Sequence, residues 1–303
     1  MAFLTQRTTR LDTGVIKLSG LTDDDRTRAD DENTTPGHSS VDWAGKRRFP
    51  AQAAPNAAGV MLRAVVTAGG RVSGAFAQAI GTPVKALAPF GTGVLLDVVL
   101  DAIAGAGIAD VAIVGDAAVG ARAATGVQLI PAAADGATNV ARALDAWPAG
   151  DDLLFATSDL PFASAAGLRA FLDASAGYDL TLPLASATAY EAAYPAAPPH
   201  VTTLGGERVA NGSVFFIRGS ARASVRTVAG KFFAARKSAL GMARLLGSAL
   251  LWRYFVRQLR IADVECRAEH VLGVRAAAIR DAAPSLSYDI DTLEDYEYAC
   301  RVR

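Results

Sequence analysis

The sequence contains few of the residues that most often bind transition metals or act as nucleophiles. Its 303 residues include two cysteines and three histidines, scattered as Cys266, Cys300, His38, His200 and His270. None of these spacings is typical of a zinc site, and the two cysteines suggest no disulfide framework, which fits a reducing cytoplasm. A histidine-rich metal site or a Ser/His/Asp triad has little material to draw on. We therefore expect the chemistry to depend on carboxylates.

The sequence also lacks a net charge and a long apolar run. Thirty basic residues balance thirty acidic ones, so we expect no nucleic acid partner for the protein as a whole. No uninterrupted apolar run reaches the roughly 18 residues of a membrane span, and no secretory signal pattern is present. The hydrophobic content of 51% is enough for a sizeable core. These features predict a globular cytoplasmic protein with one large or two modest domains.

The first 60 residues differ from the rest of the chain. Acidic residues at 23–25 and 30–32 lie among Thr, Ser, Pro and Arg, and apolar residues follow no period of 2 or 3.6. We expect residues 1–60 to be a disordered tail, with Met61 a candidate natural start. The remaining residues, 61–303, are expected to form the folded domain.

Beyond Met61, apolar segments typical of strands and helices alternate. Strands are predicted over 62–67, 110–114, 127–130, 153–157, 178–183, 212–217 and 286–290, and helices over 93–106, 136–147, 163–174, 238–259 and from Thr292 onward. This alternation predicts an α/β fold, a Rossmann-like three-layer sandwich around a mainly parallel sheet. In such a sheet, ligands collect at the carboxyl ends of the strands.

The first strand ends in a turn suited to phosphates. Thr67 and Ala68 lead into Gly69 and Gly70, and Lys85 is the first lysine after the turn. Glycines let backbone N–H groups approach phosphate oxygens closely, and a lysine adds a positive point charge. The simpler interpretation of such a pair is an ordinary strand-to-helix turn.

Two acidic segments follow strands further along the chain. Asp159, in an Asp-Leu-Pro motif, leaves the strand at 153–157, although an aspartate there is also a common helix cap. Asp289 and Asp291 share one face if 286–290 is a strand. The alternative there is a capping box, with Asp291 or Thr292 as the cap. Two carboxylates from separate segments, together with triphosphate oxygens, suit Mg²⁺.

The order of these motifs resembles that of the MobA-like NTP transferases, nucleotidyltransferases of the nucleotide-diphospho-sugar transferase (GT-A) superfamily. The resemblance covers about residues 62–225 and 286–301. One feature departs from the family pattern. Family members carry an arginine a few residues beyond the glycines, whereas here Arg71 follows Gly70 directly.

The resemblance implies roles for particular residues. It implies that Lys85, Asp159 and Asp291 are catalytic, and that the two aspartates hold Mg²⁺. The residues that it implies for nucleotide binding are Thr67, Ala68, Gly69, Gly70, Lys85, Gly136 and Asn139, and Asn211 and Gly212 are implied to contact the acceptor.

The resemblance predicts transfer of a nucleoside monophosphate (NMP) group from a nucleoside triphosphate (NTP) to a phosphorylated acceptor, a sugar phosphate or a cofactor phosphate, with release of pyrophosphate. An acceptor phosphate is already ionised, so no histidine base is needed. Two alternatives remain open: a GT-A glycosyltransferase that uses an NDP-sugar, and a noncatalytic nucleotide-binding regulatory protein. Release of pyrophosphate or of free NDP distinguishes the two enzymes.

A basic segment over 208–262 is the part of the chain that the family core explains least, and it overlaps an expected helical insertion at about 220–273. It contains ten basic residues from Arg218 onward and no acid until Asp263. The simple interpretation is a solvated stripe on a helix. The alternatives are that Arg236, Lys237 and Arg244 receive an anionic acceptor, or that the helix makes peripheral contact with a membrane surface.

Overall fold

The computed structural model describes residues 59–123, 126–235, 241, 244–245 and 247–303. The tail expected over 1–60 therefore lies almost wholly outside the described residues. Arg236, Lys237 and much of the first half of the helix expected at 238–259 also lie outside them. Among the residues that are described, no helix is long and apolar enough to cross a membrane.

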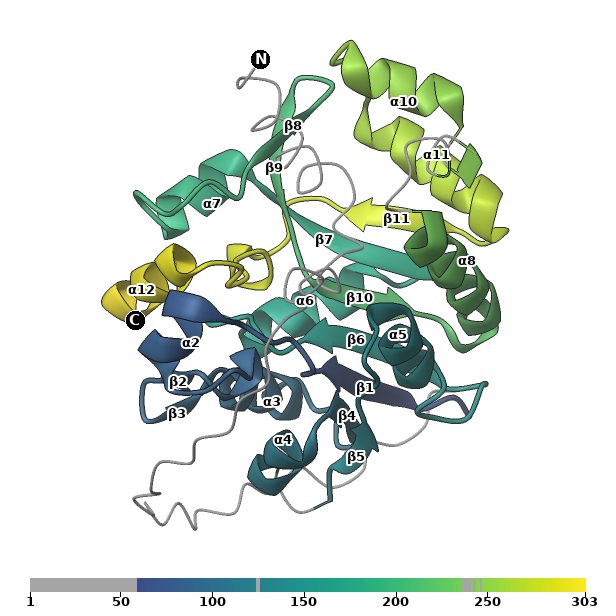
Figure 1. Ribbon diagram of the computed structural model, residues 1–303. Coiled ribbons are helices and arrows are strands. Elements are labelled where there is room, and N and C mark those ends of the chain that lie inside the picture. Colours follow the sequence, from purple (N-terminus) through teal and green to yellow (C-terminus); the bar gives the residue numbers. More distant parts are fainter. Residues whose placement is uncertain (1–58, 124–125, 236–240, 242–243, 246) are drawn as a thin grey trace.

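A nine-stranded mixed sheet forms the centre of the molecule (Figure 1). Its order is β5-β4-β1-β6-β10-β7-β9-β8, with β11 beside β7. The strands span β1 Leu62–Thr67, β4 Val111–Gly115, β5 Gln128–Pro131, β6 Asp152–Thr157, β7 Leu180–Ser186, β8 Thr202–Leu204, β9 Glu207–Asn211, β10 Val214–Ile217 and β11 Ala276–Ile279. The half from β5 to β6 is parallel, whereas β10 runs antiparallel between β6 and β7. The predicted α/β fold is confirmed, with a sheet that is parallel only in part.

Helices cover both faces of this sheet. The helices are α2 Gly74–Ile80, α3 Leu95–Gly105, α4 Ala117–Arg122, α5 Gly136–Leu144, α6 Ala165–Ala174, α7 Ala187–Ala193, α8 Arg222–Ala235, α10 Ser248–Phe255, α11 Ile261–Leu272 and α12 Leu293–Val302. Along β1, Ala64 and Val66 pack with α3 and α6, whereas Val65 between them packs with α5 on the opposite face. This strand periodicity separates two apolar layers, as a three-layer sandwich requires.

Short elements complete the fold, and a third apolar cluster lies at the end of the sheet where α2, α7 and α12 lie. The short elements are the 3-10 helices η1 Lys85–Leu87, η2 Gly219–Ala221 and η3 Pro284–Leu286, and a hairpin of β2 Pro89–Phe90 with β3 Gly93–Val94. The third cluster includes Tyr190, Tyr288 and Tyr298, which stack on one another. It holds the C-terminal segment against the sheet.

The strand predicted over 286–290 is not formed. After η3 the chain is irregular as far as Asp291, and the last strand is β11, which pairs with β7. Leu286, Tyr288 and Ile290 are each fully buried, so their apolar alternation reflects packing without strand pairing. The earlier inference that Asp289 and Asp291 share a strand face is therefore wrong.

Basic residues of the 208–262 segment find acidic or carbonyl partners from elsewhere in the chain. The buried Arg222 donates to the carbonyl oxygens of Leu144 and Trp147 at the end of α5, where the helix dipole favours a cation. Arg226 Nε lies 2.9 Å from a carboxylate oxygen of Asp145. Arg222 and Arg226 therefore help α8 pack on α5. They are not part of the solvated stripe of surface charge that the sequence suggested.

Candidate active site

The site begins where β1 and β6 end side by side. Thr67 and Thr157 are register partners at the ends of these parallel strands, and Ser158 N donates to Thr67 O at 3.1 Å. The turn that contains Ala68 and the segment that carries Asp159 therefore leave the sheet at one edge. This is the edge at which α/β proteins bind ligands.

The glycine turn lies between Lys85 and the first turn of α5. Lys85 N donates to Gly70 O at 2.9 Å, and a Cβ added to Gly70 would lie 3.4 Å from Lys85 Cε. A Cβ added to Gly69 would lie 3.4 Å from the Ala132 Cβ and 3.7 Å from the Asn139 side-chain nitrogen. The fold thus brings together Gly69, Gly70, Lys85 and Asn139, four of the residues implied to bind the nucleotide.

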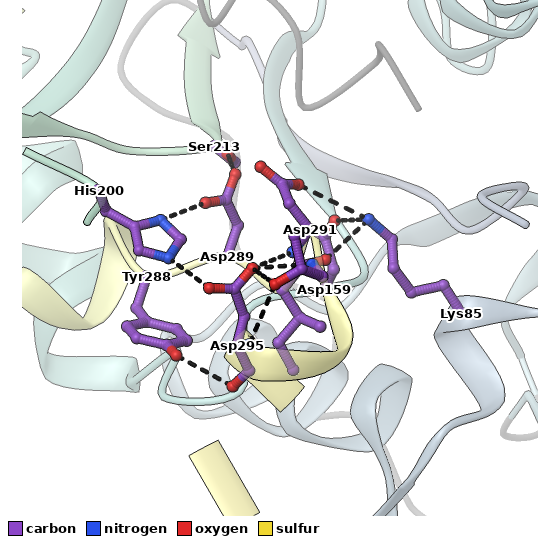
Figure 2. A network of polar contacts seen from close by, with 10 residues as sticks. Lys85, Asp159, His200, Ser213, Tyr288, Asp289, Asp291 and Asp295 are labelled. Atoms are coloured by element: carbon purple, nitrogen blue, oxygen red, sulfur yellow. Dashed lines mark hydrogen bonds and ion pairs between the residues drawn. The ribbon is translucent and has the colours of Figure 1, made fainter. Parts of the chain in front are cut away.

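Lys85 connects the turn to both predicted catalytic carboxylates (Figure 2). Its Nζ lies 2.7 Å from Asp159 Oδ2 and 3.9 Å from Asp291 Oδ1, and it donates to the Ile290 carbonyl oxygen at 2.9 Å. Lys85 and Asp159 are each about 5% exposed, so their ion pair lies in a low-dielectric environment. The three residues implied to be catalytic form one charged group.

Asp159 has spare ligand capacity. Its Oδ1 is buried and has no hydrogen-bond partner within the part of the chain that the structure describes. Most buried carboxylate oxygens have a partner, so an unsatisfied one is typical of a position that receives an ion or ligand. Asp159 also does not cap the next helix, since Ser164 caps α6.

The donor set is small for a metal held by protein alone. No cluster of three or more His, Cys, Asp or Glu side chains able to hold a metal occurs in the described ranges. Mg²⁺, however, is commonly held by one or two carboxylates, with substrate phosphates and water completing its six ligands. Asp159 and the partly exposed Asp291 therefore fit Mg²⁺ bound with a nucleotide.

Behind Asp291 lies a buried network that centres on His200 (Figure 2). His200 Nδ1 is 3.3 Å from Asp289 Oδ1, and its Nε2 is 3.0 Å from Asp295 Oδ1. Ser213 Oγ donates to Asp289 Oδ2 at 3.0 Å. The network ties the C-terminal segment to the loop that follows β9.

Asp295 fixes the backbone that carries Asp291. Its Oδ2 accepts from the amide nitrogens of Asp291 and Thr292, at 3.0 and 2.8 Å, and from Thr292 Oγ1. Burial acts to raise the pKa of Asp295, but the hydrogen bonds from His200 and Thr292 outweigh it and the pKa is lowered. Of the two predicted caps, Thr292 is the one that caps α12, with Asp295 as its capping-box partner. Asp291 does not cap this helix.

The remaining candidates are placed less directly. Gly136 is the first residue of α5, and the side chain of Asn139 exchanges two hydrogen bonds with the Ala133 backbone, so it holds the loop beside Gly69. At Gly212, a Cβ would overlap the Leu286 carbonyl, and this glycine serves packing. Asn211 ends β9 and lines a cavity described below.

Two arginines do not join the charged group in the structure. Arg71 is exposed, and its Nη1 lies 3.5 Å from Asp116. Arg244 is also exposed and lies in the helical region together with Lys231 and His270.

Sequence reasoning missed most of the supporting network. The spacing of Asp289, Asp291 and Asp295 marked an acidic segment, but it did not show which carboxylate faces Lys85. No signal in the sequence connected His200 to this segment, because the contact spans 95 residues between His200 and Asp295. Only the fold brings them together.

Comparison with known proteins supports the fold and identifies the family. The family model for the MobA-like NTP transferase domain matches residues 64–253. A hypothetical transferase from Thermus thermophilus is 28% identical with a TM-score of 0.66, and the match covers 78% of this chain and 99% of that one. No match was found among proteins of curated function.

Two further solved structures are similar at lower identity. The 2-C-methyl-D-erythritol 4-phosphate cytidylyltransferase from Thermus thermophilus is 18% identical with a TM-score of 0.46, and the match covers 80% of this chain and 98% of that one. Rv0371c from Mycobacterium tuberculosis, in a complex with manganese, is 17% identical with a TM-score of 0.46, and the match covers 80% of this chain and 99% of that one.

The fold and the family match together define a nucleotidyltransferase, an enzyme class that transfers NMP from NTP. Because the family model matches well over half of this chain, the chain belongs to the family of MobA-like NTP transferase domains.

Proposed function

We propose that this protein transfers the NMP group of an Mg²⁺-bound NTP to a phosphorylated small-molecule acceptor and releases pyrophosphate. The observation that carries the proposal is the ion-paired group of buried Lys85 and Asp159 with the partly exposed Asp291, beside the Gly69–Gly70 turn. Within the described residues, Asp159 Oδ1 has no hydrogen-bond partner. A turn open to phosphate oxygens adjoins two carboxylates that suit Mg²⁺.

The residues around the turn bind and orient the triphosphate. Gly69 and Gly70 let the nucleotide approach the backbone, and any side chain at Gly70 would contact Lys85. Lys85 supplies positive charge next to the phosphates, and the Asn139 hydrogen bonds to Ala133 hold the loop that faces the turn. This geometry holds the α-phosphorus in place for in-line attack.

In the reaction, an oxygen of the acceptor phosphate forms a bond to the α-phosphorus of the NTP. The bond from that phosphorus to the bridging oxygen breaks, and pyrophosphate leaves with the electron pair. When bound, Mg²⁺ neutralises charge on the triphosphate and the leaving group. The acceptor is ionised at neutral pH, so the site needs no proton acceptor.

The His200 network holds Asp291 in position. Asp295 binds the Asp291 amide, and His200 joins Asp295 to Asp289. We assign these residues a positioning role, because they hold the backbone that carries Asp291. Outer hydrogen bonds of this kind commonly tune a metal ligand.

The test is a screen of the full chain for pyrophosphate release with each of the four NTPs and Mg²⁺. The acceptor panel contains sugar phosphates, alditol phosphates and cofactor phosphates. We expect release that needs both an NTP and one acceptor, and that Asp159→Asn reduces at least a hundredfold. The matched control is Asp173→Asn, on the exposed side of α6, which should keep the full rate.

Three results would contradict the proposal. Release of free NDP from an NDP-sugar would identify a glycosyltransferase. NTP binding without turnover over the whole panel would identify a regulatory protein. Full activity of Asp159→Asn would place the reaction elsewhere in the molecule.

A further inference from the structure

The helices α8, α10 and α11, here called the helical cap, lie side by side over one part of the sheet (Figure 1). A partly open apolar cavity is lined by residues of the sheet and of this cap. Its volume is about 230 Å³. Phe155 and Phe215 form part of its floor on the sheet, and Phe232, Leu250 and Ala268 close it from the cap. Protein interiors rarely leave such a space, because an empty apolar cavity is destabilising.

The walls of the cavity leave few polar atoms for water. Among its described lining residues only Thr202, Asn211, Glu265 and Arg267 are polar, and Glu265 Oε1 accepts from the Ala278 amide at 2.8 Å. A water molecule needs two to four polar partners, so a cavity of this kind stays dry or takes an apolar ligand. A cavity of about 150 Å³ takes up benzene, so by proportion this one suits about nine carbon atoms.

One cation is partly buried in the cavity wall. Arg267 Nη2 donates to the Leu245 carbonyl at 2.7 Å, while its Nε is buried and has no hydrogen-bond partner in the described part of the chain. A buried guanidinium N–H without a partner is costly. An anion at this point would satisfy it.

Arg267 also lines a second, open hollow on the cap surface. Lys231, Arg244 and His270 line this hollow, which shares Arg267, Leu245 and Val271 with the apolar cavity. No carboxylate is among its described lining residues. The apolar cavity therefore adjoins the basic hollow at Arg267.

We propose that the helical cap binds a single-chain amphiphile with an anionic head. The hydrocarbon chain fills the apolar cavity, and a phosphate or carboxylate head pairs with Arg267, Lys231 and Arg244. The basic residues of the open hollow favour an anionic head, and the apolar cavity next to it favours a hydrocarbon chain. Together they select this class of ligand over a neutral alcohol or a free anion. The site is separate from the nucleotide turn, so the proposal does not depend on the transfer reaction.

The experiment is isothermal titration calorimetry of the full-length protein, without nucleotide. The ligands are alkyl phosphates of six to sixteen carbons, kept below their micellar concentrations. We expect affinity to rise by about fourfold for each methylene up to about ten carbons and then to level off. Decanoate should bind in the same way. Decanol and inorganic phosphate should each bind at least tenfold more weakly than decyl phosphate.

Two variants separate the head from the chain. Arg267→Gln should weaken decyl phosphate at least tenfold and leave decanol unchanged, whereas Arg275→Gln, on an exposed arginine outside both spaces, should change neither. Ala268→Phe fills the cavity, so it should abolish binding of both and raise the melting temperature. Ala229→Leu is a milder version if that variant does not fold.

Four outcomes would overturn the proposal. Inorganic phosphate that binds as well as decyl phosphate would indicate an anion site only. Unchanged decyl phosphate affinity in Arg267→Gln would show that Arg267 does not bind the anionic head. Binding only to phosphatidylglycerol vesicles, with no binding of monomeric amphiphile, would indicate a membrane-facing surface. Unchanged binding in a folded Ala268→Phe variant would show that the hydrocarbon chain of the ligand does not lie in this cavity.

Discussion

Replacing Lys85 with methionine tests the charged group without any knowledge of the acceptor. In the folded protein, the Lys85 ammonium is 2.7 Å from Asp159 Oδ2, and both side chains are only 6% exposed. Lys85→Met leaves the Asp159 carboxylate buried without its cation. Removal of one partner of a buried ion pair costs about 3–5 kcal/mol, so we expect a loss of this size in the free energy of unfolding.

The same variant should respond strongly to Mg²⁺. The Lys85 ammonium and the metal would neutralise the same two carboxylates, so the ion should bind more tightly once the ammonium is gone. A ligand present at 100 times its dissociation constant stabilises by about 2.7 kcal/mol. We therefore expect millimolar Mg²⁺ to restore much of the stability lost in Lys85→Met and to stabilise the native protein less.

Urea unfolding with and without Mg²⁺ measures both effects. Lys231→Met removes an exposed lysine of α8 and serves as the control, with stability within about 0.5 kcal/mol of the native protein. An unchanged stability for Lys85→Met would refute the buried pair. Equal stabilisation of native and Lys85→Met protein by Mg²⁺ would show that the ion does not reach these carboxylates.

Three further predictions concern the supporting structure. Asp295→Asn should lower the free energy of unfolding by about 2–4 kcal/mol, since it weakens the cap of α12 and the His200 contact. Because the folded pKa of Asp295 is lowered, its stabilisation is complete above the ordinary value of 3.8 and is lost as pH falls through the folded value. Acid unfolding should therefore be shallower in Asp295→Asn than in the native protein, and parallel curves would contradict this. Gly212→Ala should cost about 1–3 kcal/mol, because its Cβ would overlap the Leu286 carbonyl. Gly230→Ala, at an exposed position of α8 with open space around its Cβ, should cost nothing in the same thermal melt. Removal of residues 1–60 should leave both the melting temperature and turnover unchanged, and a large drop in melting temperature would show that this stretch packs on the domain.

The N-terminal half of the fold was predictable because its strands have strong local signals. Leu62–Thr67 matches the predicted strand in full, and Asp152–Thr157 differs from it by one residue. These strands are apolar on both faces, as buried parallel strands are. The turn at Gly69 and Gly70 could be placed at the correct edge for the same reason.

The C-terminal half was less predictable because its local signals mislead. Three of the four residues in Ala276–Ile279 are alanines, which have little preference for strands, yet pairing with β7 makes this segment a strand. The alternating residues Leu286, Tyr288 and Ile290 are the reverse case, because tertiary packing buries them without a ladder. Local pattern alone cannot distinguish these two situations.

The candidate site was predictable only in its inner part. The motif order led to Lys85, Asp159 and Asp291, and the fold brings these three together. The role of His200 depends on contacts with Asp289 and Asp295, which lie about 90 residues away in the sequence. Such a contact has no local signature.

The most direct test of the central claim is a crystal structure of the full chain with Mn²⁺ and a nonhydrolysable NTP, in which anomalous diffraction locates the ion. We expect the ion at a distance of about 2.0–2.2 Å from a carboxylate oxygen of Asp159, with Asp291 as a second ligand. The triphosphate should lie against the Gly69–Gly70 turn and contact Lys85. An ion bound away from Asp159, or a triphosphate held by the helical cap, would contradict the account.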